Sequence, residues 1–426
     1  MNIIIVGNGI TGITCARNIR KMNPRAEITV ISSETDYFYS RTALMYIYMG
    51  HMKYEHTKPY EDSFWSKNRI NLIRAFVKTL NQDKTISLDD GLNLAYDKLI
   101  IASGSKPKKF GCTGENLNGV QGLYSIQDLE KLERNTQNIS AAIIVGAGLI
   151  GVELAEMLSS RKIDTTILVR EKAYWAGVLP EEEAQLIGRH IQNHGIKLRF
   201  NTSLREILSD GQGSVKAIMT DSDETIPCEF LGLTIGVEPN IDFLKSSKID
   251  IDKGVLINEF FETNIPDVYA AGDCAQFRKP KPAAPAIEQL WYTGKMQAET
   301  LAKIICSNKT AYERGIWFNS AKFFDIEYQT YGQISAQINK GQATFYWEHP
   351  NGKQAFRANY NQSDRSLIGF NFIGIRFRQV VAEEWIRGRK TIEYVIEHLS
   401  EGWFDPEFSK PFYLDIRKHF KGQMLN

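Results

Sequence analysis

The sequence lacks several features that would narrow its function at once. No apolar run approaches the roughly 20 residues that a helix needs to cross a bilayer. The apolar start of the chain ends in a glycine turn, unlike a signal peptide. Lys plus Arg (51) and Asp plus Glu (50) nearly cancel, so no charge excess points to nucleic acid or another charged partner. We therefore expect no membrane span and no nucleic-acid partner.

Cysteine is also scarce, and no two cysteines lie at C-x-x-C or C-x-x-x-x-C spacing. This spacing argues against a local redox disulfide and against a cysteine-based zinc site, and it is typical of a reducing compartment. It predicts a cytoplasmic protein with no metal. The cysteines are Cys15, Cys112, Cys228, Cys274 and Cys306.

The chain begins with a strand–turn–helix pattern. An apolar run at residues 3–6 precedes Gly7, Gly9 and Gly12, which form G-x-G-x-x-G, and a helix is expected at residues 13–21. Such glycines allow a tight turn, close approach of the backbone to a pyrophosphate and close helix–strand packing. The free N–H groups of the helix start favour phosphate. The pattern predicts a dinucleotide site.

Glu34 follows the second expected strand, at residues 28–31. An acidic residue at this distance from the glycines is placed to accept a hydrogen bond from an adenosine ribose. A solvated Glu at a strand end fits the same pattern. Arg41, in an aromatic stretch, is read either as a contact to phosphate or adenine or as a surface charge.

Further short strands are expected at residues 70–77, 85–88 and 96–102. The last one ends abruptly in Ser103, Gly104 and Ser105, which indicates a tight crossover out of the first domain.

The middle of the chain repeats the opening pattern. An apolar strand at residues 143–145 precedes Gly146, Gly148 and Gly151, and a helix and a strand at residues 165–169 follow. Two matches in strand–turn–helix context are much rarer by chance than one. The sequence therefore predicts two dinucleotide sites.

The ribose-reading residue of the second site is Val169 or Arg170, depending on a register of one residue. Arg170 and Lys172 would favour NADPH, whereas Glu171 would favour NADH, and the sequence leaves both open. A small antiparallel layer is expected from residues 198–200, 214–219 and 229–233, and a glycine crossover at Gly236 returns the chain.

A short buried strand at residues 268–271 ends in Gly272 and Asp273. Ligands bind at the carboxyl ends of parallel strands, and a carboxylate there can bond a chain of sugar-like hydroxyls. A helix is expected at residues 285–305, and Trp291 in it is read as a core residue or a cofactor contact.

The chain changes character near residue 311, where aromatic residues become dense. We expect a small α+β domain with a basic tail at Arg417, Lys418 and Lys421 that is a solvated end. Its elements are predicted as strands at 322–329, 343–347 and 366–375 and a helix at 377–387.

Together these motifs resemble the pyridine nucleotide–disulfide oxidoreductase superfamily, and especially its ferredoxin, rubredoxin and nitrite reductase-type NAD(P)H reductases. The matching pieces are VGNGITG, YSR, LIIASGSKP, VGAGLIGVELA, IGVEPN and NIPDVYAAGDCA, over roughly residues 1–305. The resemblance implies an α/β fold with two Rossmann-like domains, the FAD domain interrupted by the NAD(P) domain, plus the C-terminal α+β domain. The implied boundaries are 1–113 with 233–310, 114–232, and 311–426.

The resemblance also implies roles for residues. The first loop would hold the FAD pyrophosphate, Asp273 the ribityl chain, and Glu34 with Arg41 the adenosine half. The second loop would hold the NAD(P)H pyrophosphate, with Glu153 near the nicotinamide. Further implied cofactor-binding residues are Ser33, Ala102, Ser103, Gly104, Arg170, Gly236, Glu288, Gln289 and Trp291.

The chain departs from the family in having no paired cysteines, and Ser40, Arg41 and Thr42 stand where one branch carries a single cysteine. Tyr46 stands where ferredoxin reductase-like members often have Lys. The resemblance favours an FAD-dependent NAD(P)H oxidoreductase that passes electrons to a small redox protein. Alternatives are reduction of quinone or oxygen, and a redox-sensing binding protein similar to apoptosis-inducing factor. A homodimer is left open.

Overall fold

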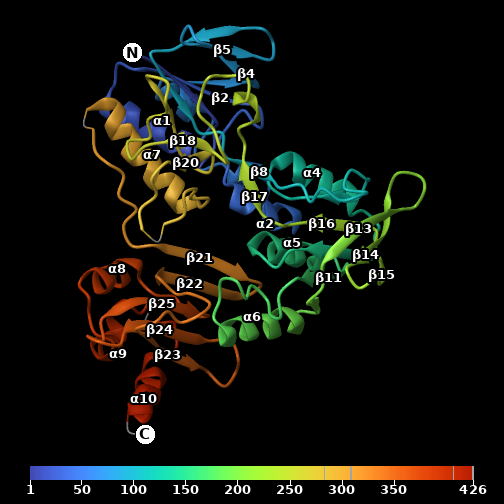
Figure 1. The fold of residues 1–426 in the computed structure, drawn as a ribbon, viewed down its shortest axis with the longest axis vertical. Coiled ribbons are helices and arrows are strands. Elements are labelled where there is room, and N and C mark those ends of the chain that lie inside the picture. The colour runs from blue at the N-terminus through green and yellow to red at the C-terminus, as the bar shows by residue number, and fades with distance from the viewer. Residues whose placement is uncertain (283, 308, 406, 425–426) are drawn as a thin grey trace. The chain divides into compact units, whose positions relative to one another are not determined.

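The apolar start of the chain forms the middle strand of a parallel sheet. The structure is a computed structural model that describes residues 1–282, 284–307, 309–405 and 407–424 (Figure 1). In spatial order the strands of this sheet are β3 (Ile70–Arg74), β2 (Glu27–Ser32), β1 (Asn2–Val6), β7 (Lys98–Ile101) and β19 (Val268–Ala270). The order reverses beside β1, and such a switch point is where α/β sheets bind ligands.

The first parallel sheet belongs to a unit made of three chain segments, residues 1–108, 122–134 and 236–314. Two of its helices, α1 and α7, lie side by side (Figure 1). Its helices are α1 (Ile10–Met22), α2 (Leu44–Tyr48), α3 (Ser63–Lys67), α4 (Ile126–Asn135) and α7 (Trp291–Cys306). Its remaining strands are β4 (Val77–Leu80), β5 (Thr85–Leu88) and β6 (Asn93–Ala95), the pair β8 (Ser105–Pro107) and β17 (Val237–Pro239), and the pair β18 (Val255–Ile257) and β20 (Ala275–Phe277).

The second unit contains residues 109–121, 135–235 and 315–426, and its own parallel sheet repeats the order of the first four strands but ends in β9, which precedes the others along the chain. In spatial order the strands are β12 (Lys197–Phe200), β11 (Asp164–Val169), β10 (Ala141–Val145), β16 (Phe230–Leu233) and β9 (Val120–Gln121). The helices of this part are α5 (Leu149–Ser160) and α6 (Glu181–Asn193), and β13 (Leu204–Ser209), β14 (Val215–Thr220) and β15 (Thr225–Pro227) form an antiparallel layer.

The expected antiparallel layer was wrong for two of its three strands. β12 and β16 belong to the parallel sheet, and only β14 of the three lies in the antiparallel layer. The residues of β16 are all buried. Burial on both faces is typical of a central parallel strand and leaves no alternation of apolar and polar residues.

The C-terminal part of the second unit is an antiparallel sheet with helices around an aromatic core. Its strands are, in spatial order, β21 (Phe318–Phe323), β22 (Ile326–Gly332), β25 (Leu367–Ile373), β24 (Ala355–Asn361) and β23 (Gln342–Glu348). Its helices are α8 (Gln379–Arg387), α9 (Ile392–His398) and α10 (Tyr413–Met424).

Two expectations for this C-terminal part were wrong. The single strand expected at 322–329 is broken by a hairpin turn at Phe324 and Asp325, where Phe324 has a left-handed φ of 55°. The basic tail is not simply a solvated end, because it forms α10 and Arg417 donates to the carbonyls of Ile396 and Glu397.

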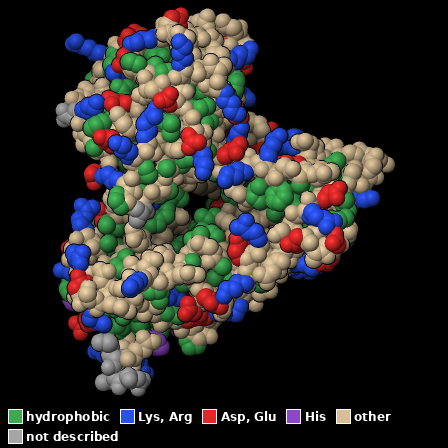
Figure 2. All heavy atoms as spheres, viewed as in Figure 1, with side chains coloured by type: hydrophobic (Ala, Val, Ile, Leu, Met, Phe, Trp, Pro, Cys, Tyr) green, Lys and Arg blue, Asp and Glu red, His purple; other side chains and the backbone are tan. Residues whose placement is uncertain are grey.

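The α/β class with two Rossmann-like sheets and a C-terminal domain is confirmed. Contacts divide the chain into the two units above, and the three-domain boundaries stay a prediction. Among the described residues, no helix has both the length and the apolar character needed to cross a membrane. Figure 2 shows Lys and Arg interspersed with Asp and Glu on the face in view, consistent with the balanced charge.

Candidate functional site

The first glycine loop joins β1 to α1 at the switch point of its sheet. Gly7 has a φ of 116°, and a Cβ there would lie 2.1 Å from the carbonyl oxygen of Ala102. A Cβ at Gly12 would lie 1.9 Å from the carbonyl oxygen of Gly7. A Cβ at Gly9 would meet nothing within 4 Å, and Gly9 precedes the first residue of α1. Two glycines thus permit close packing, and the third leaves open space where helix N–H groups can meet a phosphate.

The second glycine loop, between β10 and α5, has the same geometry. Gly146 has a φ of 119°, and its Cβ would lie 2.5 Å from the carbonyl oxygen of Thr234, which directly follows β16. The Cβ of residue 151 would lie 2.3 Å from the carbonyl oxygen of Gly146, and Gly148 again faces open space. Both loops therefore fit a dinucleotide pyrophosphate.

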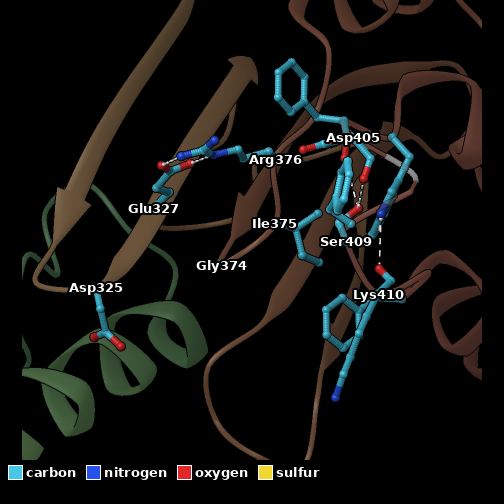
Figure 3. Close-up of a pocket in the computed structure, with 12 residues that line it drawn as sticks. Asp325, Glu327, Gly374, Ile375, Arg376, Asp405, Ser409 and Lys410 are labelled. Atoms are coloured by element: carbon cyan, nitrogen blue, oxygen red, sulfur yellow. Dashed lines mark hydrogen bonds and ion pairs between the residues drawn. The ribbon is translucent and has the colours of Figure 1, made fainter.

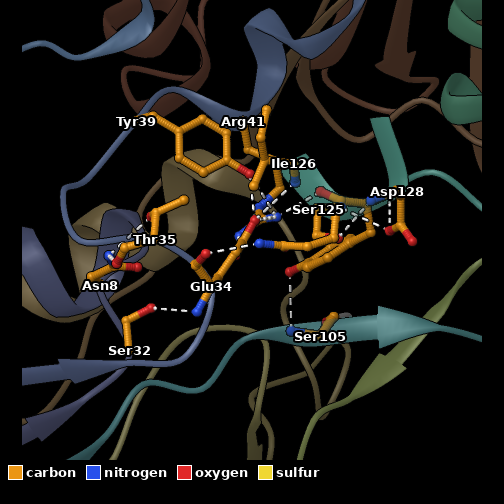
Figure 4. Close-up of polar contacts among 12 residues, drawn as sticks. Asn8, Ser32, Glu34, Thr35, Tyr39, Arg41, Ser105, Ser125, Ile126 and Asp128 are labelled. Carbon is orange, nitrogen blue, oxygen red and sulfur yellow. Dashed lines mark hydrogen bonds and ion pairs between the residues drawn. The ribbon is translucent and has the colours of Figure 1, made fainter. Parts of the chain in front are cut away.

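Glu34 and Arg41 form an ion pair after β2 (Figure 4). The two guanidinium nitrogens of Arg41 lie 2.9 and 2.7 Å from the two carboxylate oxygens of Glu34, and the Tyr39 hydroxyl donates to the same carboxylate at 2.5 Å. Burial by itself raises the pKa of Glu34, but the charge and hydrogen bonds of Arg41 lower it below its usual value. Arg41 is therefore not a free surface charge, and its contact with a cofactor stays a prediction.

This ion pair also touches the start of α4. The guanidinium of Arg41 donates to the carbonyl of Tyr124 at 2.6 Å, and the N–H of Ile126 donates to Glu34 at 3.2 Å. Asp128 accepts from the N–H of Ser125 at 2.9 Å, while the Ser125 hydroxyl accepts from the N–H of Asp128, which is a capping box. The start of α4 is thus tied to the Glu34–Arg41 ion pair.

Asp273 lies at the end of β19, behind a glycine that approaches α1. Gly272 has a φ of 78°, and its Cβ would lie 2.5 Å from the hydroxyl oxygen of Thr11. The Asp273 carboxylate accepts from the Ser105 hydroxyl at 3.0 Å, and Gln289 donates to that hydroxyl at 2.9 Å. Burial raises the pKa of Asp273. Sequence reasoning missed Ser105 as a partner, although it stands in the same turn as Ser103 and Gly104.

Glu288 sits in a buried network that supports this turn. Its carboxylate accepts from Gln297 and Tyr312, each at 3.0 Å, and Arg314 lies at 3.2 Å. The carboxamide oxygen of Gln297 accepts from the N–H of Gly272 at 2.7 Å. The network places Glu288 in the core of the unit, so its direct contact with a cofactor stays a prediction.

The helix expected at residues 285–305 begins later, at Trp291. Residues 285–290 form neither helix nor strand, and Leu290 precedes the helix with β-region dihedrals. The side chain of Trp291 is 40% exposed, so it is not a core residue. It remains a predicted cofactor contact at the start of α7.

Four predicted residues lie in turns around the first sheet. Ser33 is exposed after β2, and the hydroxyl of Ser103 donates to the carbonyl of Asn240 at 2.8 Å. Gly104 and Gly236 have left-handed φ values of 70° and 107°. These contacts are to protein atoms, and the cofactor roles stay predictions.

The end of β11 distinguishes the two candidates for reading a ribose. Val169 is fully buried, whereas the Arg170 side chain is 81% exposed and pairs with Glu171 at 2.9 Å. Strand pairing gives a second way to match positions in the two sheets. Val6 at the end of β1 pairs with Ile31 in β2, and Val145 at the end of β10 pairs with Leu168 in β11.

This register makes Glu171 the counterpart of Glu34, since each is the third residue after its paired residue. Sequence reasoning missed the equivalence, because it counted from the glycines and not from the strand pairing.

Glu153 lies on α5, one turn after the second loop. Burial, with a smaller contribution from Glu156, raises its pKa to about 7. The Tyr174 hydroxyl donates to the carbonyl of Gly148 at 3.0 Å and so fixes the turn from the other side. A carboxyl group that titrates near neutral pH beside a nucleotide loop is a candidate functional group.

The five cysteines are all free. Cys15, Cys228 and Cys274 are buried, and burial raises the pKa of each thiol, that of Cys228 to about 12. Buried thiols with raised pKa values are poor nucleophiles.

The comparisons with known proteins agree with this geometry. A family model described as "Pyridine nucleotide-disulphide oxidoreductase" matches residues 1–290. The ferredoxin–NAD(+) reductase component of the p-cumate 2,3-dioxygenase system of Pseudomonas putida is 25% identical over 399 residues, which cover 92% of this chain and 94% of that protein.

Two further comparisons differ in coverage. The assimilatory nitrate reductase electron transfer subunit of Bacillus subtilis is 26% identical over 307 residues, 71% of this chain, and the match spans only 39% of that longer protein. A crystal structure of a ferredoxin reductase from Rhodopseudomonas palustris has the same fold, with a TM-score of 0.80 at 19% identity over 98% of this chain and 99% of that one.

Proposed function

Because the chain belongs to the pyridine nucleotide-disulphide oxidoreductase family, we propose that it is an FAD-dependent oxidoreductase that takes a hydride from a nicotinamide nucleotide and reduces a small redox protein of the ferredoxin or rubredoxin type. The observation that carries the proposal is the pair of equivalent glycine loops at two switch points, together with five free cysteines. The ferredoxin reductase relative supports the class of acceptor. The scattered free cysteines support a cytoplasmic location.

Bound FAD supplies the chemistry of accepting a hydride and returning single electrons. In the proposed arrangement Gly7, Gly9 and Gly12 hold its pyrophosphate against the start of α1. Asp273, oriented by Ser105, binds the ribityl hydroxyls, because a carboxylate that already accepts one hydroxyl hydrogen bond retains further acceptor positions. Glu34 and Arg41 bind the adenosine half. The remaining residues assigned to this site are Ser33, Ala102, Ser103, Gly104, Gly236, Glu288, Gln289 and Trp291.

The nicotinamide nucleotide is assigned to the second loop. Gly146, Gly148 and Gly151 bind its pyrophosphate, and Glu153 lies toward the nicotinamide end. We propose NADH as the preferred donor, since Glu171 occupies the position equivalent to Glu34 and a carboxylate there accepts from a ribose 2′-hydroxyl but repels a 2′-phosphate.

Nucleotide preference tests this assignment independently of the acceptor. We expect a higher kcat/KM with NADH than with NADPH, and Glu171→Gln should reduce the ratio by about tenfold, a change that corresponds to roughly 1.4 kcal/mol. Arg170→Gln is the matched control one residue away, and it should not increase the preference for NADPH. A wild-type preference for NADPH would contradict the role of Glu171.

The absence of paired cysteines bears on how electrons leave the flavin in the proposed reaction. Thiol relays need an accessible, low-pKa thiol, and the buried thiols here have raised pKa values. The chain's own residues therefore bind and orient the two nucleotides and exclude water, and the acceptor receives electrons without a protein disulfide.

Anaerobic reduction tests the proposed function directly. The purified protein should contain FAD, its flavin absorbance should be bleached by one equivalent of NADH, and added ferredoxin or rubredoxin should restore it. Protein without flavin, or a flavin that NADH does not bleach, would contradict the proposal. Turnover with quinone or oxygen but with neither redox protein would replace it with the alternative reductase or oxidase activity.

A further inference from the structure

A cluster of two histidines and one aspartate, none of which belongs to a glycine loop, lies within the second unit. His190 is on α6 and His194 directly follows its last residue. The spacing of four places both rings on one face of the helix. Asp325 comes from the β21–β22 turn of the C-terminal part, and Figure 3 shows its side chain directed toward the helix drawn in green.

The three side chains converge on a small volume. The Nε2 atom of His190 lies 2.7 Å from Oδ1 of Asp325, and the Nε2 atom of His194 lies 3.2 Å from the same oxygen. One possible ligand atom from each of the three residues lies within 4.8 Å of those of the other two. Ligand atoms at about 2.0–2.2 Å from a tetrahedral ion lie roughly 3.3–3.6 Å apart, so the exposed Asp325 side chain needs only a small rotation to open the cluster to that size.

His194 is oriented as a metal ligand usually is. Its Nδ1 atom lies 3.0 Å from the carbonyl oxygen of His190, so Nδ1 carries the proton and donates it. Its ring stacks on Phe324 with 4.4 Å between the ring centres. A backbone carbonyl that fixes one nitrogen leaves the other as a lone-pair donor in a defined direction, which is the arrangement found around protein-bound metals.

His190 provides the second, independent observation. Its side chain is 3% exposed, and its buried Nε2 atom makes no hydrogen bond of acceptable geometry in spite of the short distance to Asp325. Buried polar atoms are nearly always satisfied, so such an atom calls for a partner. A cation coordinated by the imidazole and by the carboxylate would give this atom a partner.

Asp325 leaves the cluster accessible. Its side chain is 55% exposed, and its second oxygen, Oδ2, faces Lys353 at 3.2 Å. One carboxylate oxygen is thus held by the lysine, while the other faces the two imidazoles. Solvent can reach the cluster from this side, which gives an ion an entry path and leaves coordination positions for water.

We propose that His190, His194 and Asp325 bind a divalent ion of the zinc type. Two imidazoles and one carboxylate suit Zn²⁺ and its first-row neighbours, whereas Mg²⁺ and Ca²⁺ prefer ligand sets made only of oxygen. The ion links α6, next to the second glycine loop's sheet, to the β21–β22 turn of the C-terminal part. It is a structural ion remote from either glycine loop along the chain, and it does not depend on the proposed oxidoreductase activity.

Zinc titration of the full-length protein, stripped of metal by a chelator and dialysed, tests the site. Isothermal titration calorimetry with ZnCl₂ should give one equivalent bound, and thermal unfolding should shift to higher temperature on addition of zinc. Co²⁺ should bind in its place and give visible absorption bands typical of low coordination number. Mg²⁺ at the same concentration should give neither effect.

His194→Gln and Asp325→Asn are the informative variants, because both positions are partly exposed and the buried His190 is left intact. Each should weaken zinc binding at least tenfold and abolish the thermal shift. His398→Gln is the matched control, since its Nδ1 also contacts the carbonyl four residues earlier and its ring also stacks on an aromatic neighbour, Tyr394.

The control variant should bind zinc as the wild type does. Circular dichroism shows whether each variant is folded before titration. A folded wild type that binds no zinc at one equivalent, or a folded His194→Gln protein that binds it with unchanged affinity, would overturn the proposal.

Discussion

Replacing Glu153 by glutamine should change how the stability of the second unit depends on pH. The folded protein holds the proton of Glu153 up to about pH 7, whereas the unfolded chain releases it near 4.5. Between these values the folded state binds more protons than the unfolded state, so the free energy of unfolding falls as pH rises. The stabilising effect of the protonated group is complete below pH 4.5 and is lost above pH 7. A glutamine at this position stays neutral at every pH and so keeps this stabilising effect.

The size of the effect follows from the two pKa values. A rise from 4.5 to about 7 corresponds to at most about 3.4 kcal/mol, because one pKa step equals about 1.4 kcal/mol. The side chain is only half-buried, so screening by solvent reduces this to roughly 2 kcal/mol. Glu153→Gln should therefore match the wild type near pH 5 and exceed it by about that amount at pH 8.

Urea unfolding of the flavin-free protein at pH 5, 6, 7 and 8 measures this difference, with fluorescence and circular dichroism compared to detect intermediates. Glu401→Gln, which neutralises an exposed carboxylate in the same unit, is the control for the loss of a carboxylate charge. A constant difference between Glu153→Gln and the wild type from pH 5 to pH 8 would refute the reasoning, since it would mean that Glu153 titrates alike in both states.

The other predictions concern packing and paired charges. Gly12→Ala should lose flavin and destabilise the first unit, because its Cβ would lie 1.9 Å from the carbonyl oxygen of Gly7. Gly9→Ala should fold normally and lose only flavin affinity, because its Cβ would meet nothing within 4 Å. Flavin content and thermal unfolding distinguish the two variants. Arg41→Met should raise the pKa of Glu34 in the folded protein. A folded-state pKa below 4.5 contributes stability above that pH, so urea unfolding should show a larger loss of stability at pH 7 than at pH 4. The guanidinium of Arg357 lies 3.3 Å from the buried carboxylate of Glu183. Arg357→Met leaves this carboxylate without its charged partner and should destabilise the second unit by roughly 3–5 kcal/mol in urea unfolding.

The parts of this molecule that sequence could predict are those set by neighbours along the chain. The loops at Gly7 and Gly146 were recognisable because the glycines of each loop stand at a fixed spacing between an apolar strand and a helix, although the carbonyls that exclude a Cβ belong to Ala102 and Thr234. The strand ending at Asp273 was found for the same reason. The C-terminal sheet was anticipated only in part, because nothing local reveals that the chain turns at Phe324.

What sequence could not predict depends on partners that are distant along the chain. The direction of β16 is set by its pairing with β10, and its four buried residues carry no sign of that partner. The network around Glu288 depends on Gln297, Tyr312 and Arg314, and no spacing rule connects them. The equivalence of Glu171 to Glu34 follows from strand pairing, whereas the sequence alone left Arg170, Glu171 and Lys172 open.

The three-segment composition of the first unit has a consequence for the order of events during synthesis. β19 pairs with β7 through Val268 and Leu99, so the sheet around β1 lacks its last strand until the ribosome has passed residue 268. The sheet around β10 contains only strands made before residue 234 and can form earlier. Until then, the nascent chain carries an unpaired edge at β7, a site at which strands of other chains can add. With Asp273 as the proposed ligand of the ribityl chain, uptake of flavin is a late step, and a chaperone that covers this edge would act on the growing chain before it.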